Sequence, residues 1–213
     1  MADLKATFNA ADPSTPGHYG PSQTALLLLD FHTMFVEKLG GPKATAALVA
    51  AAQLRTWAKA RGILVVHALV DVDATPSPTL KGAERFNSVV GVMKSEGAGE
   101  HEELLRHVDE SDLTFTRTPG RVSALSSPGL SDALQQRNIK SLILTGLSTS
   151  GCVLRTTIPA TEAGFVVTVI SDACADRKQN VHDVAVEDIF PMTAHVTTAT
   201  EFQEGYKNAL ESK

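Results

Sequence analysis

A cysteine lies where a predicted strand gives way to a predicted helix, a position at which a thiol can act as a nucleophile. Cys152 follows the segment Gly-Leu-Ser-Thr-Ser-Gly at 146–151 and begins a helical pattern. Backbone N–H groups and the positive end of the helix dipole at such a position stabilise a thiolate and can bind an oxyanion. Free cysteines also serve as small buried apolar residues, so position alone leaves both interpretations open. For Cys174, the buried, inert interpretation is favoured.

A carboxylate comes directly after a run of four leucines. Asp30 follows leucines 26–29, and charged side chains are rarely buried without a partner. Asp30 is therefore predicted to be either a site residue that a rigid strand holds against a cation, or a solvated or capping residue of the next loop. His32 is interpreted as a satisfied loop histidine, and His67 as a core histidine.

The hydropathy pattern predicts the elements that must position these residues. Apolar runs typical of buried strands occur at 24–31, 63–70, 113–117, 140–147, 165–173 and 194–198. Helical periodicity occurs at 43–61, 102–110, 131–139, 152–164 and 181–190. Residues 1–22 are predicted to be an irregular lead-in, and residues 71–100 a long surface excursion. This alternation predicts an α/β fold, a Rossmann-like three-layer sandwich with a mainly parallel six-stranded sheet.

In such sheets, ligands bind beyond the carboxyl ends of the strands, near the topological switch point. This rule selects residues at four strand ends: Asp30 and His32, Arg117 and Arg121, residues 146–152, and residues 172–176. Signatures of other chemistries are missing from the sequence. Position 150 is Ser, so the turn is not a Gly-x-Ser-x-Gly elbow, and no Gly-rich dinucleotide motif, Walker loop or zinc-ligand spacing occurs.

The composition is that of a globular protein with a full core, because 43% of the 213 residues are hydrophobic and 20% are charged. A single domain spanning residues 1–213 is expected. The net charge of −5 argues against a nucleic-acid partner. With only two cysteines and no apolar run of membrane-spanning length, we expect no disulfide framework, no membrane segment and a cytoplasmic location. The polar N-terminus also lacks the apolar stretch of a signal peptide.

The pattern as a whole resembles the isochorismatase-like cysteine hydrolases, which include nicotinamidases and N-carbamoylsarcosine amidohydrolases. The resemblance covers residues 24 to about 202. It rests on Asp30 with Phe35 five residues later, on the segment 121–134, on His182 and residues 196–202, and above all on residues 146–174. That last segment is similar to the family's Gly-x-x-Thr-x-x-Cys-Val run with its following helix, strand and Asp-Ala pair. These motifs are specific for the superfamily and not for a substrate.

The resemblance implies particular site residues. The family's nucleophile falls on Cys152 and its catalytic aspartate on Asp30. Its oxyanion hole, made of two backbone N–H groups, falls on Ser148 and Cys152. A non-proline cis peptide usually shapes that hole, and here it would join Leu147 and Ser148.

The third catalytic position differs from the family. Where the family has a lysine, five residues after an aspartate, this chain has Arg117, and the turn that follows is two residues longer. Arg117 is the predicted catalytic cation, and Arg121 is the alternative. An arginine can supply charge but cannot shuttle a proton, because its pKa exceeds ~12.

The expected activity is hydrolysis of a small-molecule amide or related C–N bond through a cysteine nucleophile. No cofactor or metal is expected, because the segment after the second strand lacks the histidines with which nicotinamidases hold a metal. Two alternatives stay open: an isochorismatase-type enol-ether hydrolase, which needs no cysteine nucleophile, and a catalytically weak family member that acts by binding. The expected partners are a small-molecule substrate and further copies of the chain, because relatives usually form dimers or tetramers.

Overall fold

The computed structural model describes residues 4–106 and 108–212, and at its centre is a six-stranded parallel sheet. The order across the sheet is β3-β2-β1-β4-β5-β6, and all five neighbouring pairs are parallel. The strands are β1 (Thr24–Leu29), β2 (Leu64–Val70), β3 (Leu113–Arg117), β4 (Ser141–Leu147), β5 (Val166–Ala175) and β6 (His195–Thr197). The predicted α/β fold is confirmed, and the switch point lies between β1 and β4.

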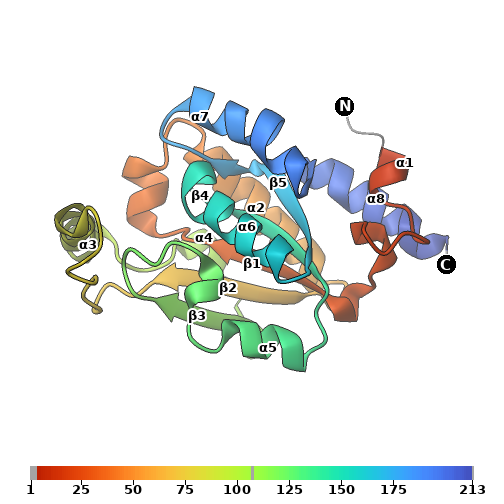
Figure 1. Ribbon diagram of the computed structural model, residues 1–213, viewed down its shortest axis with the longest axis horizontal. Helices are drawn as coiled ribbons and strands as arrows, with labels where there is room; N and C mark the ends of the chain where they lie inside the picture. The colour runs from red at the N-terminus through yellow and green to blue at the C-terminus, as the bar shows by residue number, and fades with distance from the viewer. Residues whose placement is uncertain (1–3, 107, 213) are drawn as a thin grey trace.

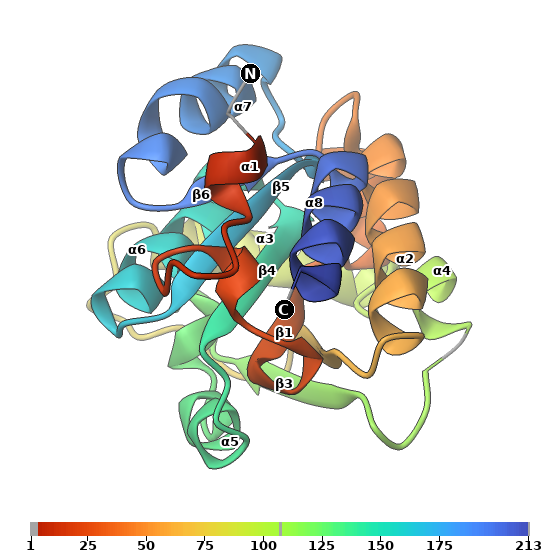
Figure 2. The ribbon, with the colours of Figure 1, turned by 90° about the vertical axis from the view of Figure 1, so that its right-hand side faces the viewer.

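Helices cover both faces of the sheet because the central strands are apolar on both faces. All of β1 is buried, and its alternate leucines enter two separate cores. One core lies against α2 (Ala44–Lys59) and α8 (Ala199–Glu211). The other lies against α5 (Leu130–Gln136) and α6 (Leu154–Glu162). Figure 2 shows α2 and α8 on one side of the sheet and α6 on the other. This arrangement is the predicted three-layer sandwich.

Two long helices were not predicted from the sequence. Helix α8 begins at a capping box, in which the side chains of Thr198 and Glu201 each bind the other's backbone N–H, and its Phe202 and Tyr206 are fully buried. Helix α3 (Ala83–Glu96) lies within the predicted excursion 71–100. Figure 1 shows α3 beyond the carboxyl ends of β1 and β2, apart from the rest of the fold.

The shorter helical segments lie near the N-terminus and between the strands. The predicted irregular lead-in contains a helical turn, α1 (Leu4–Thr7), and two 3₁₀ turns. Helix α4 (Glu102–Leu105) is shorter than predicted, and α7 (Gln179–Val184) continues into a π-helical turn, Ala185–Ile189. No helix among the described residues is both long enough and apolar enough to span a bilayer.

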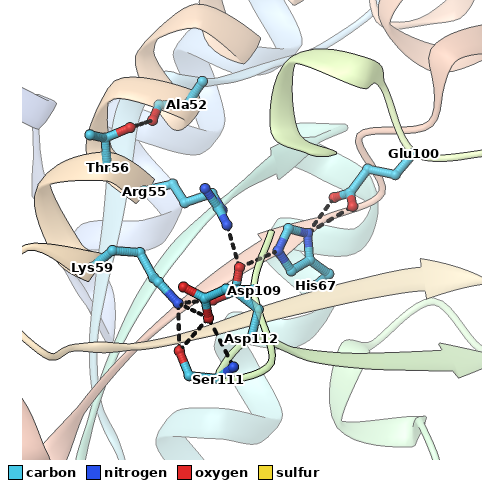
Figure 3. A network of polar contacts seen from close by, with 9 residues as sticks. All are labelled: Ala52, Arg55, Thr56, Lys59, His67, Glu100, Asp109, Ser111 and Asp112. Carbon is cyan, nitrogen blue, oxygen red and sulfur yellow. Dashed lines mark hydrogen bonds and ion pairs between the residues drawn. The ribbon is translucent and has the colours of Figure 1, made fainter. Parts of the chain in front are cut away.

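A buried polar network ties β2 to α2 and to the segments before α4 and β3 (Figure 3). His67, in the middle of β2, is 1% exposed, and its Nδ1 lies 2.8 and 2.7 Å from the two carboxylate oxygens of Glu100. The fully buried carboxylate of Asp112 pairs with Arg55 and Lys59 of α2. His67 is therefore a core histidine, as predicted, and the network anchors the chain around Glu100.

Asp112→Ala is expected to lower the free energy of unfolding by about 3–5 kcal/mol, because it removes one partner of a buried ion pair. The measurement is urea unfolding followed by circular dichroism. Glu102→Ala is the matched control: it removes an exposed carboxylate that pairs with Arg106 one helical turn away, and such surface pairs contribute only ~0.3–0.5 kcal/mol. Equal losses in the two variants would contradict this account of the network.

Candidate active site

Asp30 leaves β1 in a backbone conformation that points to a constrained site. Its φ is 55°, in the left-handed region that few residues other than glycine adopt. Its N–H donates to the carbonyl of Ala68 at 3.0 Å, and the side chain is buried. A buried carboxylate needs a compensating partner.

That partner is Arg117, the last residue of β3, which is 1% exposed. Its Nη1 and Nη2 donate to the two carboxylate oxygens of Asp30, at 3.0 and 2.5 Å, and its Nε donates to the carbonyl of Arg121 at 2.8 Å. Burial lowers the pKa of Arg117, but the Asp30 carboxylate outweighs this and leaves the pKa raised, so the guanidinium stays charged. Of the two arginines considered, Arg117 thus faces Asp30, whereas the exposed Arg121 contributes a backbone carbonyl.

Cys152 follows β4, which lies next to β1 across the switch point from β3. It is 2% exposed and lies in a π-helical turn, Thr149–Val153, that leads from β4 into α6. Its Sγ lies 3.2 Å from the carbonyl oxygen of Leu147. Burial and the charge of the nearby Asp30 raise the pKa of the thiol well above its ordinary value, while Arg117 opposes the shift. Asp30, Arg117 and Cys152 thus converge in one buried site.

The raised pKa corrects one sequence-based expectation. The position of Cys152 at a helix N-terminus predicts a stabilised thiolate, but in the structure the thiol is removed from water and lies beside a carboxylate. Desolvation disfavours the charged form of any acid, and a neighbouring negative charge disfavours it further. Cys152 therefore rests as a protonated thiol beside the carboxyl group of Asp30.

The turn before Cys152 has the shape that the family resemblance implies. The peptide bond between Leu147 and Ser148 is cis. The Ser148 carbonyl accepts hydrogen bonds from the N–H groups of Gly151, at 3.0 Å, and Val153, at 3.3 Å. A Cβ at Gly151 would lie 2.5 Å from Ser148 Oγ, so a larger residue there would require the Ser148 side chain to move.

The two other candidates near the site are inert in the structure. His32 is buried, with Nδ1 2.6 Å from the carbonyl of Ala98 and Nε2 accepting from the N–H of Val70 at 3.0 Å. Burial lowers its pKa, so it is a neutral, satisfied histidine, as predicted. Cys174 lies within β5 rather than in a loop after it, and burial raises its pKa to about 12.

Comparison with known proteins places this geometry in a family, because residues 24–201 match the isochorismatase domain. The chain belongs to the isochorismatase family. It is 25% identical to the maleamate amidohydrolase of Pseudomonas putida over 187 residues, 82% of each chain. Two solved structures share its fold. A cysteine hydrolase from Pseudomonas syringae matches with a TM-score of 0.73 at 18% identity, over 90% of this chain and 95% of that one. An isochorismatase family protein from Desulfovibrio vulgaris matches with a TM-score of 0.70 at 20% identity, over 85% and 97%.

Membership in the isochorismatase family makes this protein a hydrolase. Within residues 4–106 and 108–212, no group of three or more His, Cys, Asp or Glu side chains is arranged to hold a metal ion. Two further residues contact this isochorismatase-family site, although the sequence analysis assigned neither of them a role. Asp176, just after β5, and His182, on α7, both contact the turn that carries Cys152. Only the strand-end rule pointed to Asp176, and only family resemblance to His182.

Proposed function

We propose that this hydrolase cleaves a small-molecule amide or related C–N bond through Cys152, with Asp30 as general base. The observation that carries the proposal is the buried trio: a carboxylate that pairs through both oxygens with Arg117, and a nearby buried thiol whose pKa that carboxylate raises. A base must reach the proton that it abstracts directly or through one water. Cys152 Sγ lies 3.9 Å from the carbonyl oxygen of Leu29, the residue just before Asp30, which supports this role.

In the proposed reaction, Cys152 Sγ attacks the amide carbonyl carbon while its proton passes to Asp30. The N–H groups of Ser148 and Cys152 donate to the oxyanion that forms. The C–N bond then breaks, Asp30 returns the proton to the leaving amine, and water hydrolyses the thioester to release the acid. Arg117 takes no part in proton transfer. Its bidentate hydrogen bonds hold the carboxylate in place and balance its charge.

Two features favour amide hydrolysis over the alternatives. The cysteine beside Asp30 would have no role in enol-ether hydrolysis of the isochorismatase type. The relative in Pseudomonas putida is an amidohydrolase, which supports the amide as the substrate class. A protein that acts only by binding would have no use for a buried thiol beside a carboxylate.

The test is hydrolysis of a panel of small primary amides, maleamate included, with intact-protein mass spectrometry of the quenched reaction. We expect wild-type protein to release ammonia and to carry an acyl adduct on Cys152. Cys152→Ala should lose the adduct and at least ~10³-fold in kcat, as removal of a nucleophile does elsewhere. Cys174→Ala, which changes the other buried cysteine, is the matched control and should retain both.

Other outcomes of this assay would favour the alternatives. Hydrolysis of isochorismate that survives Cys152→Ala would favour the enol-ether activity. Saturable binding of a panel member by wild-type protein without turnover or adduct would favour a binding role.

We also propose that the protein is a cytoplasmic homo-oligomer, a dimer or a tetramer. Both cysteines are free, as a reducing compartment would keep them. Large apolar side chains on α6, on α7 and shortly after it are exposed, most of all Met192 at 80%, and such side chains are common at subunit interfaces. Light scattering during size-exclusion chromatography would measure the assembly.

A further inference from the structure

Two side chains from the connection after β5 hold the turn between Ser148 and Cys152. The N–H and the hydroxyl of Ser150 both donate to Asp176 Oδ2, at 2.8 and 2.7 Å. The hydroxyl of Thr149 lies 2.8 Å from His182 Nδ1. Thr149 and Ser150, two of the three residues between the predicted oxyanion donors, are thus each tied to the same neighbouring segment.

The residues that hold the turn are themselves held in place. Asp176 is 8% exposed and follows Ala175, which pairs with Leu147 in the sheet, so its backbone is continuous with the sheet. Its carbonyl oxygen packs so closely against Gly41 that a Cβ there would lie 2.1 Å away.

His182 is half-buried on α7, and its protonation is set by several neighbours. Burial lowers its pKa and Lys43 adds to that effect, whereas Asp183 and Asp176 oppose it. The net shift is downward, so the imidazole is neutral at neutral pH and its Nδ1 can share one hydrogen bond with Thr149.

We propose that Asp176 and His182 are positioning residues that hold the N–H groups of Ser148 and Cys152 in the geometry of an oxyanion hole. The inference rests on the proposed function and adds two residues to it. Oxyanion donors work only when they are aimed in advance at the position of the developing charge, and displacement by about 1 Å costs ~10²-fold in rate. Both residues act through the turn: His182 contacts Thr149, and Asp176 accepts from Ser150.

The probe for this inference is p-nitrophenyl acetate, because its acylation of a thiol passes through an oxyanion. Cys152 Sγ forms a C–S bond with the acetyl carbon, the C–O bond breaks, and p-nitrophenolate leaves while Asp30 takes the thiol proton. Alkylation of the same thiol by iodoacetamide is the reference reaction. It displaces iodide at a saturated carbon and forms no oxyanion, so it reports on the thiol alone.

We expect Asp176→Ala and His182→Ala each to slow the nitrophenolate burst by about 10–100-fold, with KM for the ester and the rate of alkylation unchanged. Asp176→Asn retains an acceptor oxygen for the Ser150 N–H and should restore most of the burst. Asp183→Ala is the control, because Asp183 lies next to His182 on α7 and bonds Gln179 instead of the turn. Thermal melting establishes that each variant is folded, and if Asp176→Ala does not fold, His182→Ala and Asp176→Asn carry the test.

The contrary outcomes separate this inference from the proposed function. Wild-type burst rates in folded Asp176→Ala or His182→Ala would overturn the positioning role and leave the proposed function intact. Equal losses of burst and alkylation would also overturn it, because the thiol itself would then have changed. A wild-type protein that acquires no acetyl group on Cys152 would overturn the proposed function, and this inference with it.

Discussion

Asp30→Asn is expected to abolish hydrolysis while it makes Cys152 easier to alkylate. Loss of the general base should lower kcat by about 10²–10⁴-fold. The same change removes a negative charge that raises the pKa of the Cys152 thiol. With the charge gone and Arg117 still present, the pKa of the thiol falls. A larger fraction of Cys152 is then thiolate at every pH between the new pKa and the old one.

The measurement is the rate of iodoacetamide incorporation at Cys152 against pH, set beside turnover of an amide substrate. The profile of Asp30→Asn should lie at lower pH than that of wild-type protein. Cys174 is the internal reference, because its pKa of about 12 keeps it unreactive in both folded proteins. A profile that moves to higher pH, or turnover that survives the substitution, would contradict the role given to Asp30.

Arg117→Ala is expected to damage both stability and activity. It leaves the buried Asp30 carboxylate without the guanidinium that binds both its oxygens, and breaking a buried ion pair costs about 3–5 kcal/mol. Arg117 also opposes the rise in the thiol pKa, so its removal should shift the alkylation profile of Cys152 to higher pH, opposite to the effect of Asp30→Asn. Urea unfolding, the alkylation profile and amide turnover measure the three effects.

Arg117→Lys and Arg121→Ala make this prediction specific. A lysine places one positive charge opposite Asp30 and can also transfer a proton, so Arg117→Lys should keep or increase turnover on simple amides. Arg121→Ala removes only an exposed side chain and keeps the carbonyl that receives the Nε of Arg117. It should leave stability and turnover unchanged. If Arg121→Ala loses activity while Arg117→Ala keeps it, Arg121 and not Arg117 is the catalytic cation.

Local pattern was sufficient to predict the framework of the fold. Strands such as β1 and β4 are buried along their whole length, and an unbroken apolar run is the direct consequence of a sheet covered on both faces. Where the hydropathy pattern was weak, the sequence analysis did not predict the helix. Helix α3 fully buries only Met93, so its apolar periodicity is faint. The start of α8 carried a readable signal in Thr198 and Glu201, which the sequence analysis did not use.

The sequence by itself determined which residues reach the carboxyl edge of the sheet. Asp30, Arg117 and Cys152 each end or follow a predicted strand, and the carboxyl ends of parallel strands lie at the same edge. Only the tertiary structure decided how these groups behave together. The protonated resting state of Cys152 follows from its burial and from the carboxylate beside it, and neither is a property of the local sequence. The choice of Arg117 over Arg121 depends on the turn between them, in which the Arg121 carbonyl accepts a hydrogen bond from Arg117 Nε. Contacts of this kind join residues far apart in the chain, and folding alone brings them within hydrogen-bond distance.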